Sequence, residues 1–487
     1  MLKQAKKPCS QRLLLLSLAL AATTAWGDWR LSPTLSVMGR YSDNIDLDTT
    51  GGQSAFLTEI RPGLSLTGKG GRANYQVDYG LQALVFSHDS DENALNHQLS
   101  ANLRTELLED SFFLDAGAHI SQRNADQTLP SGTGNYNTTG NSLETRSLSL
   151  TPSWRSRFGN MAKLDARWQF SLADTDGATI SNTAGNNLNI QLSSGTAFNR
   201  LPWSLGYQQQ NSNGDASAKR VSSLHGTLGY LISRKTQVNA TLGQDSNDGN
   251  TAGFQQNGGS YWNLGMSWNP SPRTRLAATL GKRFNGNSYS LDFGHRTRRS
   301  AWSLRYSEQV VDTFALISNS VSYVGYMCGV SVIMVPEGSV PSDTSCVLIP
   351  GLVVPISVPS LQDGFNLTKT WVGTASYNTG KSTFSLSLSD NRLDALAAAL
   401  SSNTTSLSGS WNWRLNSRLT STLTLSSSQS DYAGSESEDW NLSWMLSRKL
   451  AKDATGVLEA RHLDRSDKST TGGYSENSLS ARVNLSF

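Results

Sequence analysis

Apolar and polar residues alternate along most of this chain, and the clearest case is its last segment. One set of alternating positions there is apolar and the other is polar: Leu479, Ala481, Val483, Leu485 and Phe487 against Ser480, Arg482, Asn484 and Ser486. Successive side chains of a β-strand point to opposite faces. The segment therefore predicts a strand with one apolar face and one polar face.

The same alternation recurs from Asp28 onward, in units of a strand, a tight turn, a second strand and a longer polar loop. Clear examples are residues 73–85, 162–172, 262–268 and 407–415. The repeat of roughly 21 residues predicts an all-β, antiparallel, up-and-down transmembrane barrel of about 22 strands, within a range of about 20–24. Charged residues fall almost entirely on the polar faces, as expected if a charge facing lipid costs ~2–4 kcal/mol at mid-membrane.

The predicted connections alternate between short and long. Short turns are expected at Gly68–Arg72, Leu108–Ser111, Arg157–Asn160, Asn199–Pro202, Ser233–Thr236, Asn269–Thr274, Asn378–Lys381 and Asn416–Arg418. Long polar loops are expected at Asn124–Asn141, Asp174–Asn187, Gln244–Gly259 and Ser427–Asp439. This asymmetry is typical of outer-membrane barrels, with short periplasmic turns and long outer loops, and a soluble sandwich has no reason for it. An even strand count places both termini on the periplasmic side.

Composition fits the same class. Hydrophobic residues make up 37%, the mean hydropathy is −0.38, and there are 42 glycines, which is polar for a protein of this length with a conventional core. Most of the 13 tryptophans lie near predicted strand ends, where indole rings suit the lipid headgroups. A net charge of +3 gives no indication of a nucleic-acid partner.

Residues 1–27 predict a secretory signal peptide. Lys3, Lys6, Lys7 and Arg12 precede the apolar stretch Leu13–Ala22, and Ala25–Gly27 supplies a small-x-small cleavage site. The apolar stretch is too short to span a bilayer as a helix, and no later segment has the ~18 apolar residues that a membrane helix needs. We expect the barrel to begin near Asp28 and to occupy residues 28–487.

The segment at about 310–365 is longer and more apolar than any other predicted connection. We expect it to be an extracellular loop holding a Cys328–Cys346 disulfide, since these are the only cysteines after the signal peptide. It is either a surface loop or an extra hairpin of the wall, or else a constriction packed into the lumen or a lid. No separate plug domain fits before the first strand, so we expect this loop, other outer loops or a partner to narrow a barrel that would otherwise leak.

The predicted inward face is rich in arginine. The candidate lumen charges are Arg30, Arg40, Arg61, Arg104, Arg146, Arg167, Arg305, Arg414, Arg461 and Arg482, with carboxylates such as Glu59, Asp165 and Asp292 on the same face. Fixed guanidinium groups would favour anions and acidic sugars. The favoured interpretation is a network of ion pairs that stiffens the wall.

Catalytic and metal motifs are missing from the sequence. It contains no G-x-S-x-G, H-E-x-x-H or C-x-x-C pattern, and its six histidines are scattered, so we predict no enzyme activity and no cofactor. Two acidic segments, Asp43–Asp48 and Asp245–Asp248, could hold Ca²⁺, but ordinary solvated turns are the favoured interpretation. We therefore predict no metal site.

Several motifs resemble a family of outer-membrane β-barrel proteins associated with the PEP-CTERM protein-sorting system, related to barrels of exopolysaccharide loci. They are Tyr41–Ile45, Trp268–Thr274, Phe293–Arg296, Ser300–Glu308 and the terminal Phe487. The end of the chain, with Leu485 and Phe487, also resembles the C-terminal insertion signal of outer-membrane barrels, which the barrel-assembly machinery reads. The resemblance implies the outer membrane of a Gram-negative bacterium and a link to exopolysaccharide, and it supplies no catalytic or binding residues.

Together these features predict an outer-membrane conduit for export of exopolysaccharide or exoprotein, with lipid, the assembly machinery, polysaccharide and periplasmic export components as partners. One alternative is a non-conducting structural or adhesive barrel whose outer loops bind matrix. A second alternative is an uptake porin. The sequence does not distinguish the substrate, the direction of transport or the oligomeric state.

Overall fold

A computed structural model describes residues 28–124, 135–175, 183–213, 218–248, 258–283, 286–312, 323–328, 331–336, 347–354, 365–395, 401–432, 435–467 and 472–487. The predicted signal peptide lies outside these residues. No helix in the described ranges is long and apolar enough to cross a bilayer.

The described chain forms β-strands and two single-turn 3₁₀ helices. In order, the elements are β1 (Asp28–Ser42), β2 (Ala55–Lys69), β3 (Ala73–Phe86), η1 (Ser90–Glu92), β4 (Ala94–Leu108), β5 (Phe112–Asn124), β6 (Ser142–Phe158), β7 (Ala162–Thr175), β8 (Thr183–Ser194), η2 (Thr196–Phe198), β9 (Trp203–Asn213), β10 (Ala218–Ser233), β11 (Thr236–Asp248), β12 (Gly258–Ser271), β13 (Thr274–Arg283), β14 (Gly286–Arg296), β15 (Ser300–Asp312), β16 (Tyr323–Cys328), β17 (Ser331–Pro336), β18 (Val347–Val354), β19 (Phe365–Asn378), β20 (Ser382–Ala395), β21 (Ser401–Arg414), β22 (Leu419–Tyr432), β23 (Ser435–Ala451), β24 (Ala454–Asp467) and β25 (Tyr474–Ser486).

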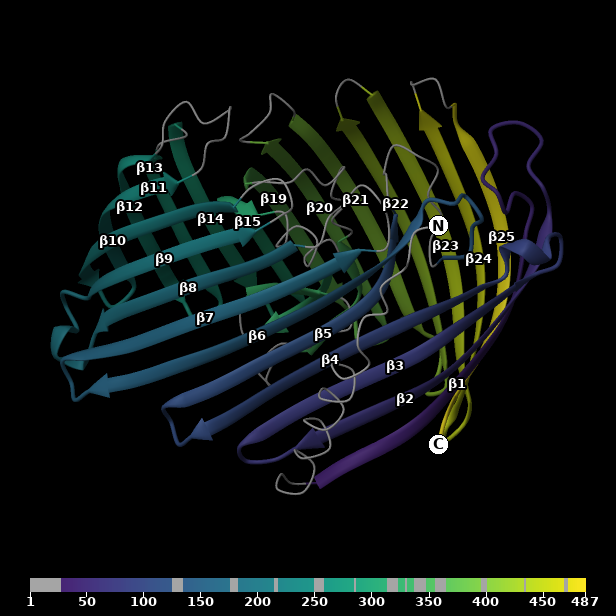
Figure 1. Cartoon of the computed structure of the whole chain (residues 1–487), viewed down its shortest axis with the longest axis horizontal. Coiled ribbons are helices and arrows are strands. Elements are labelled where there is room, and N and C mark those ends of the chain that lie inside the picture. Colours follow the sequence, from purple (N-terminus) through teal and green to yellow (C-terminus); the bar gives the residue numbers. More distant parts are fainter. Residues whose placement is uncertain are drawn as a thin grey trace, which may run out of the picture.

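The wall is a closed antiparallel barrel of 22 strands (Figure 1). Each strand pairs with the next along the chain, except that β15 pairs directly with β19. The ring closes because β1 pairs with β25 on one side and with β2 on the other. The predicted all-β antiparallel barrel and its count of about 22 strands are therefore confirmed, whereas the absence of a separate plug domain stays a prediction.

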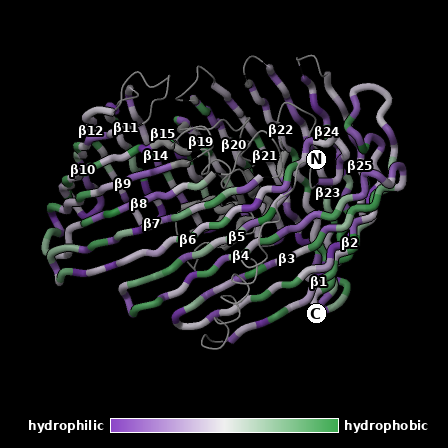
Figure 2. The backbone as a smooth tube through the Cα atoms, in the orientation of Figure 1, coloured by the Kyte–Doolittle hydropathy of each residue, from purple (hydrophilic) through white to green (hydrophobic). Residues whose placement is uncertain are grey.

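The two faces of the wall differ in the way that the alternation predicts. Large apolar side chains on the outer face are exposed, for example Leu264 at 52%, Leu386 at 50% and Leu458 at 53%. Figure 2 shows hydrophobic and hydrophilic positions alternating along the tilted strands. Many tryptophans are exposed in the same way, among them Trp29, Trp154, Trp268, Trp302, Trp371, Trp413, Trp440 and Trp444.

Most of the predicted short turns join consecutive wall strands through two to four residues, for example 70–72, 234–235 and 379–381. In one of them Gly380 has φ +94, and its N–H donates to the Asn378 side chain at 2.7 Å. Because this backbone conformation disfavours residues with a Cβ, glycine suits the position. The prediction of a long loop at Ser427–Asp439 was wrong: β22 and β23 stay paired as far as Tyr432 and Ser435. Polar residues there continue the backbone ladder, since strand pairing does not require an apolar face.

Both termini of the described chain lie at the end of the barrel that carries the short turns. Asp28 pairs with Lys69, beside the turn at residues 70–72. The Phe487 N–H donates to the Pro33 carbonyl at 2.9 Å, and its side chain is exposed. Leu485 pairs with Leu35 of β1 and Ala454 of β24, so the predicted insertion signal forms the closing edge of the ring.

The long segment at about 310–365 does not add strands to the wall. Three of its parts form a separate antiparallel sheet in the order β17-β16-β18. This sheet lies against the wall, with β18 next to β20 and β21, and β17 next to β14 and β15. An extra wall hairpin is thus excluded for β16–β18.

Candidate lumenal site

The small sheet packs against the inward face of the wall. The polar residues of β20 and β21 are buried although their apolar neighbours are exposed: Ser385, Ser387, Ser389, Ser402, Thr404, Ser406, Ser408 and Ser410 are all at most 7% accessible, whereas Leu386, Leu388 and Leu407 are 46–50% accessible. Small hydroxyl side chains leave room for a backbone to approach. Because β18 contacts these two strands, the sheet covers this part of the lumenal wall.

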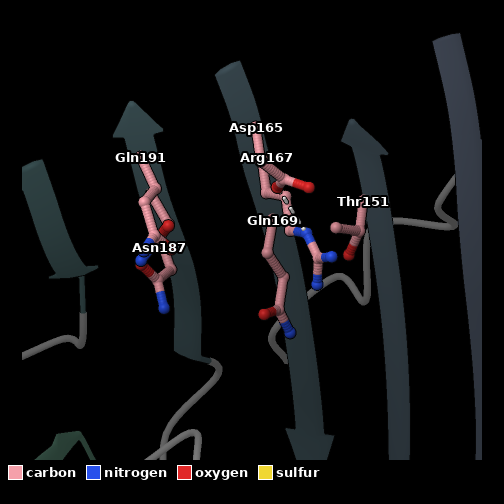
Figure 3. Close-up of a pocket in the computed structure, with 7 residues that line it drawn as sticks. Thr151, Asp165, Arg167, Gln169, Asn187 and Gln191 are labelled. Atoms are coloured by element: carbon pink, nitrogen blue, oxygen red, sulfur yellow. Dashed lines mark hydrogen bonds and ion pairs between the residues drawn. The ribbon is translucent and has the colours of Figure 1, made fainter. Parts of the chain in front are cut away.

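A polar cavity occupies another part of the inner wall (Figure 3). It has a volume of about 470 Å³ and is lined by side chains of β6, β7 and β8: Thr151, Asp165, Arg167, Gln169, Asn187, Asn189 and Gln191. Four of these seven side chains are primary amides, each with donors and an acceptor. The ring order places β7 half a circuit from β21, so this cavity lies on the wall opposite the small sheet.

The charged groups of this cavity are paired with each other. The Arg167 Nε donates to Asp165 Oδ1 at 2.9 Å, and Arg155 reaches Oδ2 of the same carboxylate at 3.2 Å. Asp165 is therefore held between two guanidinium groups. The amides are left as the groups that can exchange hydrogen bonds with a solute.

Strand register places nine of the ten candidate lumen arginines on the inward face. Four make ion pairs with carboxylates of the same or a neighbouring strand: Arg40 with Glu476 at 2.8 Å, Arg104 with Asp115 at 3.6 Å, Arg167 with Asp165 at 2.9 Å and Arg305 with Asp292 at 3.1 Å. Others donate to neutral groups: Arg414 to the Gly380 carbonyl, Arg461 to Asn441 and Arg482 to Tyr136. Arg30 and Arg61 share this face, opposite Thr67 and Ser36. These contacts pair most of the arginines with groups of the wall, and their stiffening of the wall stays a prediction.

Arg146 was predicted to face the lumen, and this prediction was wrong. It pairs with Ile120 of β5 and Asp174 of β7, and so shares the outward face with Leu148 and Leu150. Its guanidinium contacts Glu144 at 2.6 Å and Asp174 at 3.9 Å. The sequence alternation was misread here because polar residues occupy both faces of β6 near its loop end, where a strand no longer meets lipid.

A second polar cluster lies where the first and last strands meet. Glu476 of β25 accepts from Arg40 at 2.8 Å and from the Ser42 hydroxyl at 2.6 Å. Next to it, Glu59 of β2 accepts from Gln82 at 2.9 Å. All these residues are buried, which is unusual for charged groups unless they are paired.

Loop residues at the end of the barrel opposite the termini contact this cluster. The Tyr136 ring lies 5.1 Å from the Arg40 guanidinium carbon, and its hydroxyl accepts from Arg482 at 2.8 Å. Ile45 packs with Leu57, Leu84 and other inward apolar residues, and Asn137 donates to its carbonyl at 3.0 Å. Burial raises the pKa of Tyr136, although nearby Arg482 lowers it. These loops therefore contact the inner wall at the end opposite the termini.

The predicted Cys328–Cys346 disulfide falls partly outside the described residues, because Cys346 lies in an undescribed range, and it stays a prediction. The Ca²⁺ alternative at Asp43–Asp48 lies on described chain, where Asp43 bonds Asn477 and Asp46 accepts from Thr138. Sequence reasoning missed the amide-lined cavity, whose only signal was the density of Asn and Gln on consecutive inward faces.

No protein-family model matches the chain, and no curated protein matches it. Solved structures with a similar fold include the ferric enterobactin receptor PfeA from Pseudomonas aeruginosa, in complex with enterobactin (TM-score 0.51, 11% identity, covering 95% of this chain and 82% of that one). The siderophore receptor PirA from Acinetobacter baumannii has a TM-score of 0.50 at 10% identity, covering 93% of this chain and 80% of that one. The FrpB iron transporter from Neisseria meningitidis has a TM-score of 0.50 at 11% identity, covering 95% and 82%.

At these identities the likeness shows the fold alone. The chain has the fold of an outer-membrane β-barrel, with a closed 22-stranded wall that is apolar outside and polar inside. Its particular substrate is a matter for proposal.

Proposed function

We propose that this protein is an outer-membrane conduit that conducts a polysaccharide during export, as the resemblance to the PEP-CTERM-associated barrels suggests. The observation that carries the proposal is the cavity of about 470 Å³ lined by Gln169, Asn187, Asn189 and Gln191. Amide side chains can donate to and accept from sugar hydroxyl groups at once. Because the charges beside them are already paired, the surface suits a neutral glycan better than a strongly acidic one.

The fold supplies a narrowed passage for such a chain. Barrels of 22 strands are wide enough to need a filled lumen. Here β16–β18 cover the inner face of β20 and β21, and the loop carrying Tyr136 covers the inner face near β1. Narrowing by this chain's own loops, without a separate plug domain, is part of the proposal.

The structures of similar fold favour a second candidate, uptake of an iron chelate. PfeA is described as a ferric enterobactin receptor and PirA as a siderophore receptor. The inward arginines of this chain offer positive charge to an anionic chelate. The third candidate is the closed structural or adhesive barrel. No catalytic role is proposed.

Single-channel conductance of the refolded barrel, residues 28–487, separates these candidates. We expect open channels that neutral oligosaccharides such as cellohexaose block transiently, and a paired Gln169→Ala, Asn189→Ala variant whose block is about tenfold weaker, the scale of one or two lost hydrogen bonds. Gln244→Ala is the matched control, because that exposed amide lies on the outer face of β11.

Other outcomes reject the export proposal. Block by ferric enterobactin but not by oligosaccharide would point to uptake. Correctly inserted barrels that carry no current, even after reduction of cysteines, would point to the closed scaffold.

A further inference from the structure

Three loops meet at the end of the barrel opposite the termini, next to the C-terminal ends of β1 and β3. A histidine and two carboxylates lie where these loops meet. Asp46 comes from the loop at residues 43–54, and His88 and Glu92 come from the loop at residues 87–93, in which Glu92 ends η1. From a third loop, the Thr138 hydroxyl donates to Asp46 Oδ1. The Asp46 oxygen that accepts from Thr138 is also the one nearest His88 Nε2, at 3.6 Å.

The distances within this cluster suit a shared cation better than hydrogen bonds. His88 Nε2 lies 3.6 Å from Asp46 Oδ1 and 3.7 Å from Glu92 Oε2, both too long for a hydrogen bond. One ligand atom from each residue lies within 4.8 Å of the others. Metal–ligand bonds of about 2.0–2.2 Å place neighbouring ligand atoms about 3.0–3.5 Å apart, so the two distances from His88 Nε2 to the carboxylates are within a few tenths of an ångström of what a shared ion requires.

Burial leaves this cluster with polar atoms that have no partner. The His88 side chain is only 10% exposed, and Phe86 holds the ring edge-to-face at 6.1 Å between centroids. His88 Nδ1 and Glu92 Oε2 are buried without a hydrogen bond. Within the described ranges, neither carboxylate of the cluster has a lysine or arginine ion-pair partner. The Asp46 and Glu92 side chains are 23% and 34% exposed, and a cation bound between them and His88 would neutralise their charges.

We propose that Asp46, His88 and Glu92 bind one divalent transition-metal ion, of the Zn²⁺ or Mn²⁺ type. An imidazole ligand disfavours Ca²⁺ and Mg²⁺, which prefer oxygen alone. The ion ties the loop between β1 and β2 to the loop between β3 and β4, next to the seam where the barrel closes. It thereby holds the loops that cover the inner wall in place.

Metal binding by the whole refolded barrel tests this site. After treatment with chelator, the barrel is titrated with Zn²⁺ by calorimetry and with Co²⁺ by visible absorption, which reports the ligand field directly. We expect one ion per chain, and at least a ~10-fold loss of affinity in His88→Ala and in Glu92→Gln. His295→Ala is the matched control, because His295 bonds Thr274 at the opposite end of the barrel.

Heat-dependent gel mobility of each variant shows whether the barrel has folded, and Glu92→Gln keeps the test valid if His88→Ala does not fold. Absence of stoichiometric binding would overturn the proposal and leave His88 as a histidine flanked by two carboxylates. Unchanged affinity in both folded variants would overturn it equally.

Discussion

Arg40 and Glu476 lie 436 positions apart in the chain, yet the guanidinium of Arg40 donates to the carboxylate of Glu476 at 2.8 Å. Their side chains are 6% and 1% exposed. Arg40 belongs to β1 and Glu476 to β25, so this ion pair joins the two strands that close the barrel. Ser42 donates to the same carboxylate oxygen at 2.6 Å. Arg40, Ser42 and Glu476 thus form a buried polar cluster that links β1 to β25 where the barrel closes.

Glu476→Gln should destabilise the barrel by about 3–5 kcal/mol, because it leaves the Arg40 charge buried without its counter-ion. Urea unfolding of the barrel refolded in lipid vesicles measures the change in the free energy of unfolding. The control is Glu109→Gln, which removes an exposed pair with Arg72 (side chains 81% and 65% exposed) and should cost under ~1 kcal/mol. Equal changes in the free energy of unfolding for the two substitutions would show that the pair of Arg40 and Glu476 does not stabilise the closure of the barrel.

An introduced charge should lower the free energy of unfolding more on the outer face of a strand than on its lumenal face. Leu264 of β12 is 52% exposed on the outer face, and Leu264→Arg should destabilise the barrel in vesicles by ~2–4 kcal/mol. Its neighbour Asn263 faces the lumen, and Asn263→Arg should cost clearly less, since water or polar groups can solvate the guanidinium. The same urea experiment compares them. A larger loss for Asn263→Arg would reverse the assignment of the faces.

Tyr136→Phe should remove an acceptor from Arg482 and lower the free energy of unfolding at neutral pH by about 1–3 kcal/mol. Burial raises the pKa of Tyr136 above its ordinary value of 10.0, with Arg482 opposing and Glu59 adding to the shift. The folded state thus favours the neutral phenol. Its stabilisation is complete below the unfolded pKa and is lost as the pH rises through the higher folded pKa.

Unfolding curves of the two proteins from neutral pH to beyond pH ~10 test this linkage. The difference in stability between the native protein and Tyr136→Phe should shrink across the alkaline range. A constant difference would mean that Tyr136 does not titrate with folding.

Cys328 and Cys346 should form a disulfide in the periplasm-exported protein. Met327 of β16 pairs with Val347 of β18, and the two cysteines are the next residues along the chain from this pair. The described pairing of Met327 with Val347 is the contact that supports this prediction, since a disulfide needs the two Cα atoms about 4.4–6.8 Å apart. Intact mass with and without reductant, and labelling of thiols in the unfolded protein, measure the bond. Complete labelling without reductant would exclude it.

The sequence alone determined the architecture, because a barrel in lipid has to show its pattern in every strand. Leu264 and Leu386 lie outside and Asn263 and Arg167 inside, as alternation predicted, since each residue's face depends only on its parity within a strand that lipid contacts. The short turn that contains Gly380 was also predicted correctly from the sequence. The prediction was wrong where this constraint ends: Arg146 lies on the outward face near the loop end of β6.

Only the tertiary structure decided which distant residues meet. Closure of the ring brings Arg40 to Glu476, and loop packing brings Asp46 to His88 and Glu92. The placement of β16–β18 on the inner wall of β20 and β21 likewise has no periodic signal in the sequence. The alternation of apolar and polar residues indicates whether a side chain faces lipid or water. The long-range contacts depend instead on which distant segments fold next to each other, and the local sequence pattern does not contain that information.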